Sequence, residues 1–224
     1  AEGYASKEAV LGVDPDFVPG RGDLFVDGDY GVGTTEELAS AGIASYITHV
    51  GETGANFQSF LTDIDNLGVI FNVQDKAADL KAYYQDYVAA LQSDERWAGK
   101  TTKMAEVSWI EDGMPVFGSA ATESLQNEAF AMIGLDNINE DCDGSQVSIE
   151  TIIAEDPEVI VLFDYEGGPD MDEMIQSLYD NAALQDISAI KNKKVISLDF
   201  NAVYGGSGDL YTAMSDLADE FYGA

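Results

Sequence analysis

Two stretches of this chain share one pattern, Ser6-Lys-Glu-Ala-Val-Leu-Gly-Val-Asp-Pro-Asp-Phe-Val18 near the start and Ser148-Ile-Glu-Thr-Ile-Ile-Ala-Glu-Asp-Pro-Glu-Val-Ile160 far downstream. In both, a Glu stands two residues after the Ser, an apolar pair follows, and Asp-Pro begins eight residues after the Ser. The Ser is expected to cap a short helix by accepting a backbone N–H bond. The residue before Pro disfavours the helix, so the helix should end there, and the apolar run that follows predicts a buried strand.

The repeat predicts two lobes of similar topology with a cleft between them, and ligand sites concentrate at such interfaces. Helical and strand patterns alternate along the chain, which favours parallel sheets. We therefore expect an α/β fold with two Rossmann-like lobes joined by one long helix. Residues 1–74 would form the N-terminal lobe, residues 75–98 the linking helix and residues 99–224 the C-terminal lobe.

The linking helix is predicted from the longest helical pattern, Asp75–Gln92. Its apolar residues recur at the spacing of one helix face and are expected to pack into the core. They are Leu80, Tyr83, Tyr84, Tyr87, Val88 and Leu91.

Three further segments carry local predictions. Asn56 is expected to cap a helix that runs through Leu67, with Gly68 ending it. Lys103–Ile110 is predicted to be a strand of the second lobe, and Asp199–Gly208 a loop before the last helix.

The N-terminal lobe is predicted to be incomplete. In the second lobe a strand and a helix, Lys103 to Ile133, precede the Ser148 helix, whereas only Ala1 to Ala5 precede the Ser6 helix. The missing unit would leave a free sheet edge, and free edges invite pairing with another chain. We therefore expect self-association through this lobe.

The composition narrows the functional classes. The 46% hydrophobic content excludes a disordered chain. The 10 Lys+Arg against 42 Asp+Glu give a net charge of −32, which argues against nucleic-acid binding because a phosphate backbone needs Lys and Arg to neutralise it. The sequence lacks the GxSxG, Walker A and HExxH motifs. One His and one Cys cannot build a zinc site without carboxylates, so no resident metal or cofactor is expected.

Several segments resemble the substrate-binding proteins of ABC importers for iron–siderophore complexes, haem and cobalamin. The resemblance lies in Glu8–Val18 and Leu38–Tyr46, in Gly118–Ile138, and in Val147–Phe163 and Ala183–Leu198. It implies a non-enzymatic receptor with two lobes and one rigid linking helix. Such a receptor would work outside the cytoplasm, in the periplasm or lipid-anchored on the outer face of the cell membrane, and would deliver a metal chelate to an importer permease.

The resemblance also implies that an acidic residue on each lobe meets Arg on the permease. Glu123 stands at the matching position of the C-terminal lobe. On the N-terminal lobe the candidates are Glu36 and Glu37.

Ligand contacts are expected from loops at the carboxyl ends of the strands, where open α/β sheets bind ligands. Aromatic rings there suit a large flat or hydrophobic chelate. The N-terminal candidates are Arg21, Phe25, Tyr30 and His49, and the C-terminal candidates are Trp109, Tyr165, Phe200 and Tyr204.

The ligand itself is predicted only as a class. Arg21 and Arg96 are the two arginines of the chain, which is few for an anionic catecholate siderophore. This favours a neutral or weakly charged chelate such as a ferric hydroxamate, or haem or cobalamin. His49 could contact a chelated metal, and Tyr204 could ligate haem iron as a phenolate.

Two other readings stay open at this point. The first is an enzyme on a two-lobed α/β scaffold, such as a metal-assisted hydrolase or a reductase, which convergent carboxylates in the cleft would favour. The second is a surface protein of this fold that binds no small molecule.

Overall fold

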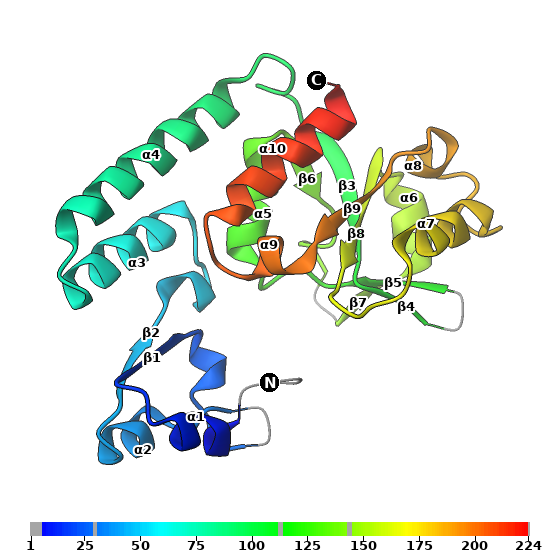
Figure 1. Cartoon of the computed structure of the whole chain (residues 1–224). Helices are drawn as coiled ribbons and strands as arrows, with labels where there is room; N and C mark the ends of the chain where they lie inside the picture. Colours follow the sequence, from blue (N-terminus) through cyan, green and yellow to red (C-terminus); the bar gives the residue numbers. More distant parts are fainter. Residues whose placement is uncertain (1–5, 29–30, 112–113, 143–144, 224) are drawn as a thin grey trace.

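A computed structural model describes residues 6–28, 31–111, 114–142 and 145–223 (Figure 1). The helices are α1 Lys7–Val13, α2 Thr35–Ser40, α3 Phe57–Ile70, α4 Gln74–Ser93, α5 Ser124–Met132, α6 Ile149–Glu155, α7 Met171–Asp180, α8 Ser188–Lys191, α9 Phe200–Tyr204 and α10 Asp209–Tyr222, with 3₁₀ turns η1 Gly22–Leu24 and η2 His49–Gly51. The strands are β1 Phe17–Gly20, β2 Ala44–Ile47, β3 Thr102–Val107, β4 Trp109–Glu111, β5 Met114–Gly118, β6 Leu135–Asn137, β7 Gln146–Val147, β8 Val159–Asp164 and β9 Val195–Asp199. None of the described helices combines the length and the apolar character needed to cross a membrane.

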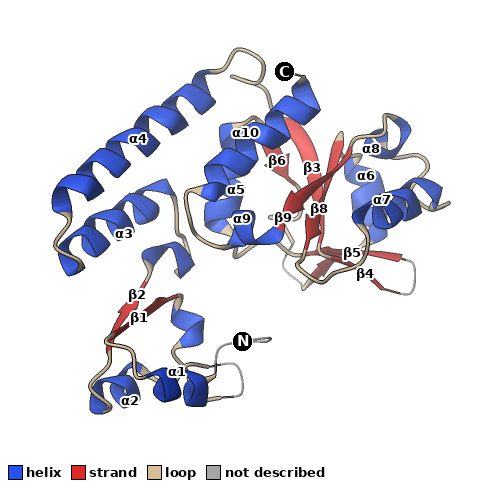
Figure 2. Cartoon of the chain, viewed as in Figure 1, coloured by secondary structure: helices blue, strands red, loops and turns tan. Residues whose placement is uncertain are grey.

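The repeated Ser-to-Asp-Pro unit folds as predicted in both places. The hydroxyls of Ser6 and Ser148 cap α1 and α6 by accepting hydrogen bonds from the backbone N–H three residues on, at 3.2 and 3.1 Å. Both helices end on an aspartate in the left-handed conformation, Asp14 at φ 47° and Asp156 at φ 50°. The strands that follow, β1 and β8, belong to separate sheets, which confirms the two-lobe prediction (Figure 2).

The two lobes carry sheets of different size. In the N-terminal lobe, β1 and β2 form a parallel pair. In the C-terminal lobe, β6, β3, β8 and β9 form a parallel sheet in that order, with α5 and α10 on one face and α6, α7 and α8 on the other (Figure 1). The fold is therefore α/β with parallel sheets, as expected from the alternating pattern.

The predicted strand Lys103–Ile110 is wrong in its second half. Strand β3 leaves the parallel sheet after Val107, and β4 pairs antiparallel with β5, placing Trp109 opposite Val116. Ser108 makes the transition, because its N–H donates to the carbonyl of Val116 at 2.9 Å. Strands β4, β5 and β7 form a second, antiparallel sheet that the sequence pattern did not predict.

The helix α3 also departs from the prediction, because Gly68 does not end it. The helix continues to Ile70, and the turn that follows places Asn72 at φ 55°. Gly68 is buried against α4, where a Cβ atom would lie 2.5 Å from the Cβ of Ala77. The glycine thus permits a close approach of α3 and α4, which lie side by side (Figure 1).

Helices α3 and α4 share one apolar core with the C-terminal lobe. Phe60 of α3 packs edge-on against Tyr84 of α4, with ring centroids 5.0 Å apart, and lies 5.3 Å from Tyr211 of α10. The α5 residue Glu128 reaches across and accepts a hydrogen bond from the N–H of Phe57 at 2.6 Å. These contacts fix α3 and α4 to the C-terminal lobe.

The predicted core stripe of α4 is correct for its second half only. Val88 and Leu91 are buried, and Tyr84 and Tyr87 pack at the edge of the core. Leu80 and Tyr83 are 46% and 54% exposed. The first half of α4 extends beyond the C-terminal lobe and has α3 as its neighbour, so it lacks a surface that would bury the whole stripe (Figure 1).

Candidate functional site

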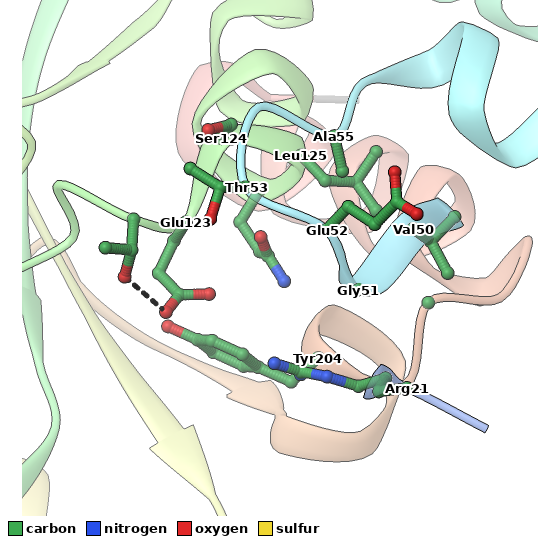
Figure 3. Close-up of a pocket in the computed structure, with 13 residues that line it drawn as sticks. Arg21, Val50, Gly51, Glu52, Thr53, Ala55, Glu123, Ser124, Leu125 and Tyr204 are labelled. Atoms are coloured by element: carbon green, nitrogen blue, oxygen red, sulfur yellow. Dashed lines mark hydrogen bonds between the residues drawn. The ribbon is translucent and has the colours of Figure 1, made fainter. Parts of the chain in front are cut away.

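A pocket of about 190 Å³ opens between the two lobes (Figure 3). Its N-terminal wall is formed by the β1–η1 turn, by η2 and by the loop that leads from η2 to α3. Its C-terminal wall is formed by the start of α5, by α9 and by the glycine-rich turn that follows α9. The residues of the first wall are Arg21, Val50, Gly51, Glu52, Thr53 and Ala55, and those of the second are Thr122, Glu123, Ser124, Leu125, Gln126, Tyr204 and Gly206.

The N-terminal wall is held by one buried carboxylate, Asp63 of α3, which is 5% exposed. Its Oδ1 accepts hydrogen bonds from the N–H of His49 at 3.0 Å and from the hydroxyl of Tyr46 at 2.6 Å, and its Oδ2 accepts from the N–H of Val50 at 3.0 Å. His49 Nδ1 lies 2.9 Å from Oδ1, which fits a ring that is protonated at this nitrogen. Burial and the bond to Asp63 raise the pKa of Tyr46 to about 12, so the phenol remains a donor.

Each wall of the pocket contributes a charged side chain near Tyr204. Arg21 extends from the N-terminal side along the ring of Tyr204, and Glu123 points from the C-terminal side toward the Tyr204 hydroxyl (Figure 3). The Nε atom of Arg21 is buried and finds no hydrogen-bond acceptor among the described residues, and the Asp23 carboxylate lies 3.5 Å from it. Glu123 accepts a hydrogen bond of 3.3 Å from the Thr122 hydroxyl. The pocket therefore offers a ligand both donor and acceptor groups.

Three aromatic rings form a continuous stack on the C-terminal side. Phe200 lies between Tyr165 and Tyr204. Its ring centroid is 4.5 Å from that of Tyr165, with an interplanar angle of 30°, and 4.7 Å from that of Tyr204, with an interplanar angle of 19°. The Tyr165 hydroxyl donates to the carbonyl of Ser108 at 3.1 Å, which fixes that end of the stack. Tyr204 is the ring that reaches the pocket. Burial raises the pKa of its phenol far above the usual range, and the nearby carboxylates of Glu106 and Glu123 add to the effect.

A buried polar network lies behind this wall, and the sequence reading missed it. Glu106 on β3 is 2% exposed. Asn137 donates from Nδ2 to Glu106 Oε2 at 3.1 Å and to Asn127 Oδ1 at 2.9 Å, and Asn139 donates to the backbone carbonyl of Glu106 at 2.9 Å. Burial raises the pKa of Glu106 to about 7; Asn137 opposes this rise and the charge of Glu123 adds to it. The available signal was one acid, Glu106, between the apolar residues Ala105 and Val107 near the end of β3.

The structure thus brings together part of the predicted ligand set. Arg21 and Tyr204 line the pocket, and Tyr165 and Phe200 stand behind Tyr204. His49 belongs to η2, where it binds Asp63 beside the pocket lining.

The remaining ligand candidates lie elsewhere. Phe25 is buried in the small core of the N-terminal lobe, and Trp109 is half-exposed on β4, away from the pocket lining. Tyr30 lies outside the described residues. Phe200 and Tyr204 form the short helix α9, where a loop was predicted; Asp199 caps this helix by accepting from the N–H of Ala202 at 2.9 Å.

The predicted docking acids have three different surroundings. Glu123 faces the pocket, and Glu36 is exposed on α2. Glu37 completes a capping box with Thr34 and pairs with Lys7 at 2.5 Å, and the hydrogen bond from Lys7 lowers the pKa of its carboxyl.

Comparison with known proteins identifies the family of this chain. A family model described as periplasmic binding protein matches residues 1–202. Among curated proteins, the petrobactin-binding protein YclQ of Bacillus subtilis (strain 168) is 27% identical over 161 residues, which cover 71% of this chain and 50% of YclQ.

Solved structures agree with this match. A periplasmic binding protein from Veillonella parvula superposes with a TM-score of 0.81 at 25% identity, over 99% of this chain and 75% of its own. The fold is also that of the haem-binding protein HutB of Vibrio cholerae, with a TM-score of 0.75 at 20% identity over 97% of this chain and 80% of HutB.

This chain spans about half the length of the curated relative that it matches. The family model nevertheless covers most of the chain, and the Veillonella parvula structure matches nearly all of it. The chain belongs to the periplasmic binding protein family.

Proposed function

We propose that this chain is the solute receptor of an ABC importer and that it binds an iron chelate between its two lobes. The observation that carries the proposal is the pocket itself, to which one lobe contributes Arg21 and the other Tyr204 and Glu123. The names of the proteins that it resembles, which refer to petrobactin for YclQ and to haem for HutB, support an iron chelate as the ligand class. The receptor would work in the periplasm or lipid-anchored on the outer face of the membrane.

The charges of the pocket favour a neutral or weakly charged chelate. Arg21 is the cation among the described lining residues, and the lining also includes the carboxylates of Glu52 and Glu123. The whole chain carries a net charge of −32, which repels anionic ligands at long range. A ferric hydroxamate fits these charges better than a catecholate does; haem and cobalamin are the other candidates.

An enzyme on the same scaffold is the competing function. The aromatic stack of Tyr165, Phe200 and Tyr204 supports the receptor, because stacked rings offer a large apolar surface to a flat or hydrophobic ligand. Membership of a binding-protein family supports the same choice.

The visible absorption spectrum of the protein purified from its native host tests the proposal. Haem, a corrinoid and a ferric siderophore absorb at different wavelengths, so a bound native ligand should identify its class. The proposed function is contradicted if the purified protein is colourless and remains colourless after incubation with all three classes of chelate.

Docking on the permease is expected to use one exposed acid on each lobe. The repeat supplies such a pair, Glu8 and Glu150, which occupy the same first-turn position of α1 and α6 and are both exposed. Glu123 faces the pocket and Glu37 is paired with Lys7, so neither is as available to a partner. Of the acids predicted from the sequence, Glu36 remains the exposed one.

Charge reversal distinguishes these acids. Glu8→Arg and Glu150→Arg should each lower receptor-stimulated ATP hydrolysis by the importer several-fold at low receptor concentration, because like charges repel during encounter. Ligand affinity should stay unchanged in both variants. Glu36→Arg is the matched control on the N-terminal lobe; if it alone reduces stimulation, the docking site lies on α2 and the assignment from the repeat is wrong.

Self-association through the N-terminal lobe remains part of the proposal. Within the described residues β1 and β2 pair with each other alone, so each has a free edge. Unpaired strand edges offer N–H and C=O groups to a second copy. Light scattering over a range of protein concentrations should show a monomer–dimer equilibrium, and a monomer at every concentration would remove this part of the proposal.

A further inference from the structure

The C-terminal wall of the pocket buries a carboxyl group that the proposed binding mode does not use. Glu106 is 2% exposed and lies one residue before the end of β3, at the carboxyl edge of the parallel sheet. Among the described residues, the hydrogen-bond donor to its carboxyl group is Asn137, at 3.1 Å. An ionised carboxylate out of water is stable only with several donors or a nearby cation. Glu106 therefore has an environment that suits its neutral form.

The titratable groups that face Glu106 are acids and phenols. Glu123, at the start of α5, adds to the effect of burial in raising the pKa of Glu106 to about 7. Glu106 in turn adds to the burial that raises the pKa values of Tyr204 on α9 and Tyr165 after β8. Hydrogen bonds connect Glu106 to the pocket wall, because Asn137 donates to Glu106 and also to Asn127 of α5, the helix that begins beside the pocket residue Glu123.

Within the described part of the chain, no cation belongs to the groups that shift the pKa of Glu106. Strand β6 contributes the amide of Asn137, and strand β8 places the apolar Val161 opposite Glu106 in the register. Arg21 lies near Tyr204 and lowers the pKa of that phenol, but it is not among the groups that shift Glu106. A proton is therefore the available source of neutralisation.

We infer that Glu106 is a proton-binding group behind the pocket wall and takes up a proton from solvent when a ligand displaces water from the pocket. The inference rests on the proposed function, because it requires a ligand that covers Tyr204. Such a ligand replaces water by a medium of lower dielectric constant. Water then screens the charged form of Glu106 less, so its repulsion by Glu123, which lines the pocket, grows.

The sign of the pH dependence follows from linkage. Because the liganded protein holds the proton more tightly than the free protein, affinity for a neutral chelate is highest below about pH 7. Above this pH it falls by up to about tenfold per pH unit, until Glu106 is ionised in the complex as well. Glu106→Gln removes this dependence, since glutamine has no proton to exchange in this range.

The first test needs no ligand. The glutamate carboxyl groups are labelled with carbon-13, and their NMR shifts are followed against pH. One resonance should titrate near pH 7, be absent in Glu106→Gln and move to lower pH in Glu123→Gln. Glu158→Gln, at an exposed glutamate of the same lobe, should leave it in place. A spectrum with no carboxyl group titrating near neutral pH overturns the inference.

The second test measures the proton directly. A neutral ferric trihydroxamate is titrated calorimetrically into the protein at about pH 7 in two buffers of different ionisation enthalpy. Wild type should take up a fraction of a proton per bound ligand, and Glu106→Gln none. Binding by wild type without proton uptake overturns the inference.

Failure of the proposed function gives a different result. If the ferric trihydroxamate, haem and cyanocobalamin all fail to bind, both the receptor assignment and the ligand-linked uptake are wrong. The NMR titration of the free protein still decides whether Glu106 holds a proton near neutral pH.

Discussion

Asp63→Asn is expected to lower the free energy of unfolding by about 3 kcal/mol, which is a large effect for one isosteric change. The carboxylate of Asp63 is 5% exposed and accepts hydrogen bonds from two backbone N–H groups and the Tyr46 hydroxyl. An amide presents one NH₂ group where the aspartate presents an oxygen. One of the buried donors of His49 or Val50 is then left facing another donor, and the charge that strengthened all of these bonds is lost.

The variant should also loosen the N-terminal wall of the pocket, because His49 and Val50 lead directly into it. Urea unfolding measures the loss of stability, and hydrogen exchange of the Val50 amide measures the loosening. Asp65→Asn is the matched control: it lies on the same helix but is exposed and pairs with Lys81 at the surface, so it should change stability by less than about 0.5 kcal/mol. Equal effects of the two substitutions would contradict the role assigned to Asp63.

Glu106→Gln is expected to stabilise the protein above neutral pH. In the folded protein the pKa of Glu106 is raised to about 7 from an ordinary value of 4.5. A carboxyl with a raised pKa binds its proton more tightly in the folded state, so wild type keeps full stability below about pH 4.5 and loses it as pH rises toward 7. At about 1.4 kcal/mol per pH unit, the difference between 4.5 and about 7 corresponds to a loss of about 3 kcal/mol.

Glutamine avoids this loss because it stays neutral. It also retains an oxygen that accepts from Asn137. Urea unfolding at about pH 8 should therefore show the variant to be more stable than wild type, and at about pH 5 the advantage should shrink or reverse. If the difference in unfolding free energy between the variant and wild type is the same at both pH values, the pKa of Glu106 is not raised in the folded protein.

The sequence predicted the features of the fold that depend on local chemistry. The Ser caps and the Asp-Pro stops of α1 and α6 act within a few residues, so their pattern was sufficient to place two lobes. The prediction that Gly68 ends α3 was wrong because the role of this glycine depends on a contact with a different helix. A glycine near a helix end usually stops the helix, but here it accommodates Ala77 of another helix, a contact that no local pattern reveals.

The residues of the candidate site also fall into two groups, those that local sequence predicts and those that depend on distant partners. Arg21 and Tyr204, both predicted as ligand contacts, line the pocket because each follows the carboxyl end of a parallel strand, Arg21 after β1 in one lobe and Tyr204 after β9 in the other. Asp63 and Glu106 were missed because their importance comes from distant partners. Asp63 lies in an amphipathic helix where an acid is ordinary, and only the folded chain shows the donors of the η2 turn around it.

The measurement that tests the central claim most directly is the affinity of a ferric trihydroxamate, haem and cyanocobalamin for wild type and for pocket variants. At least one of these chelates is expected to bind. Tyr204→Ala and Arg21→Ala should each weaken that binding by about tenfold or more, since each removes a contact from one of the two walls. Tyr83→Ala, at an exposed tyrosine of α4, should leave affinity unchanged. A chelate that binds all four proteins equally well would show that the pocket between the lobes is not the ligand site.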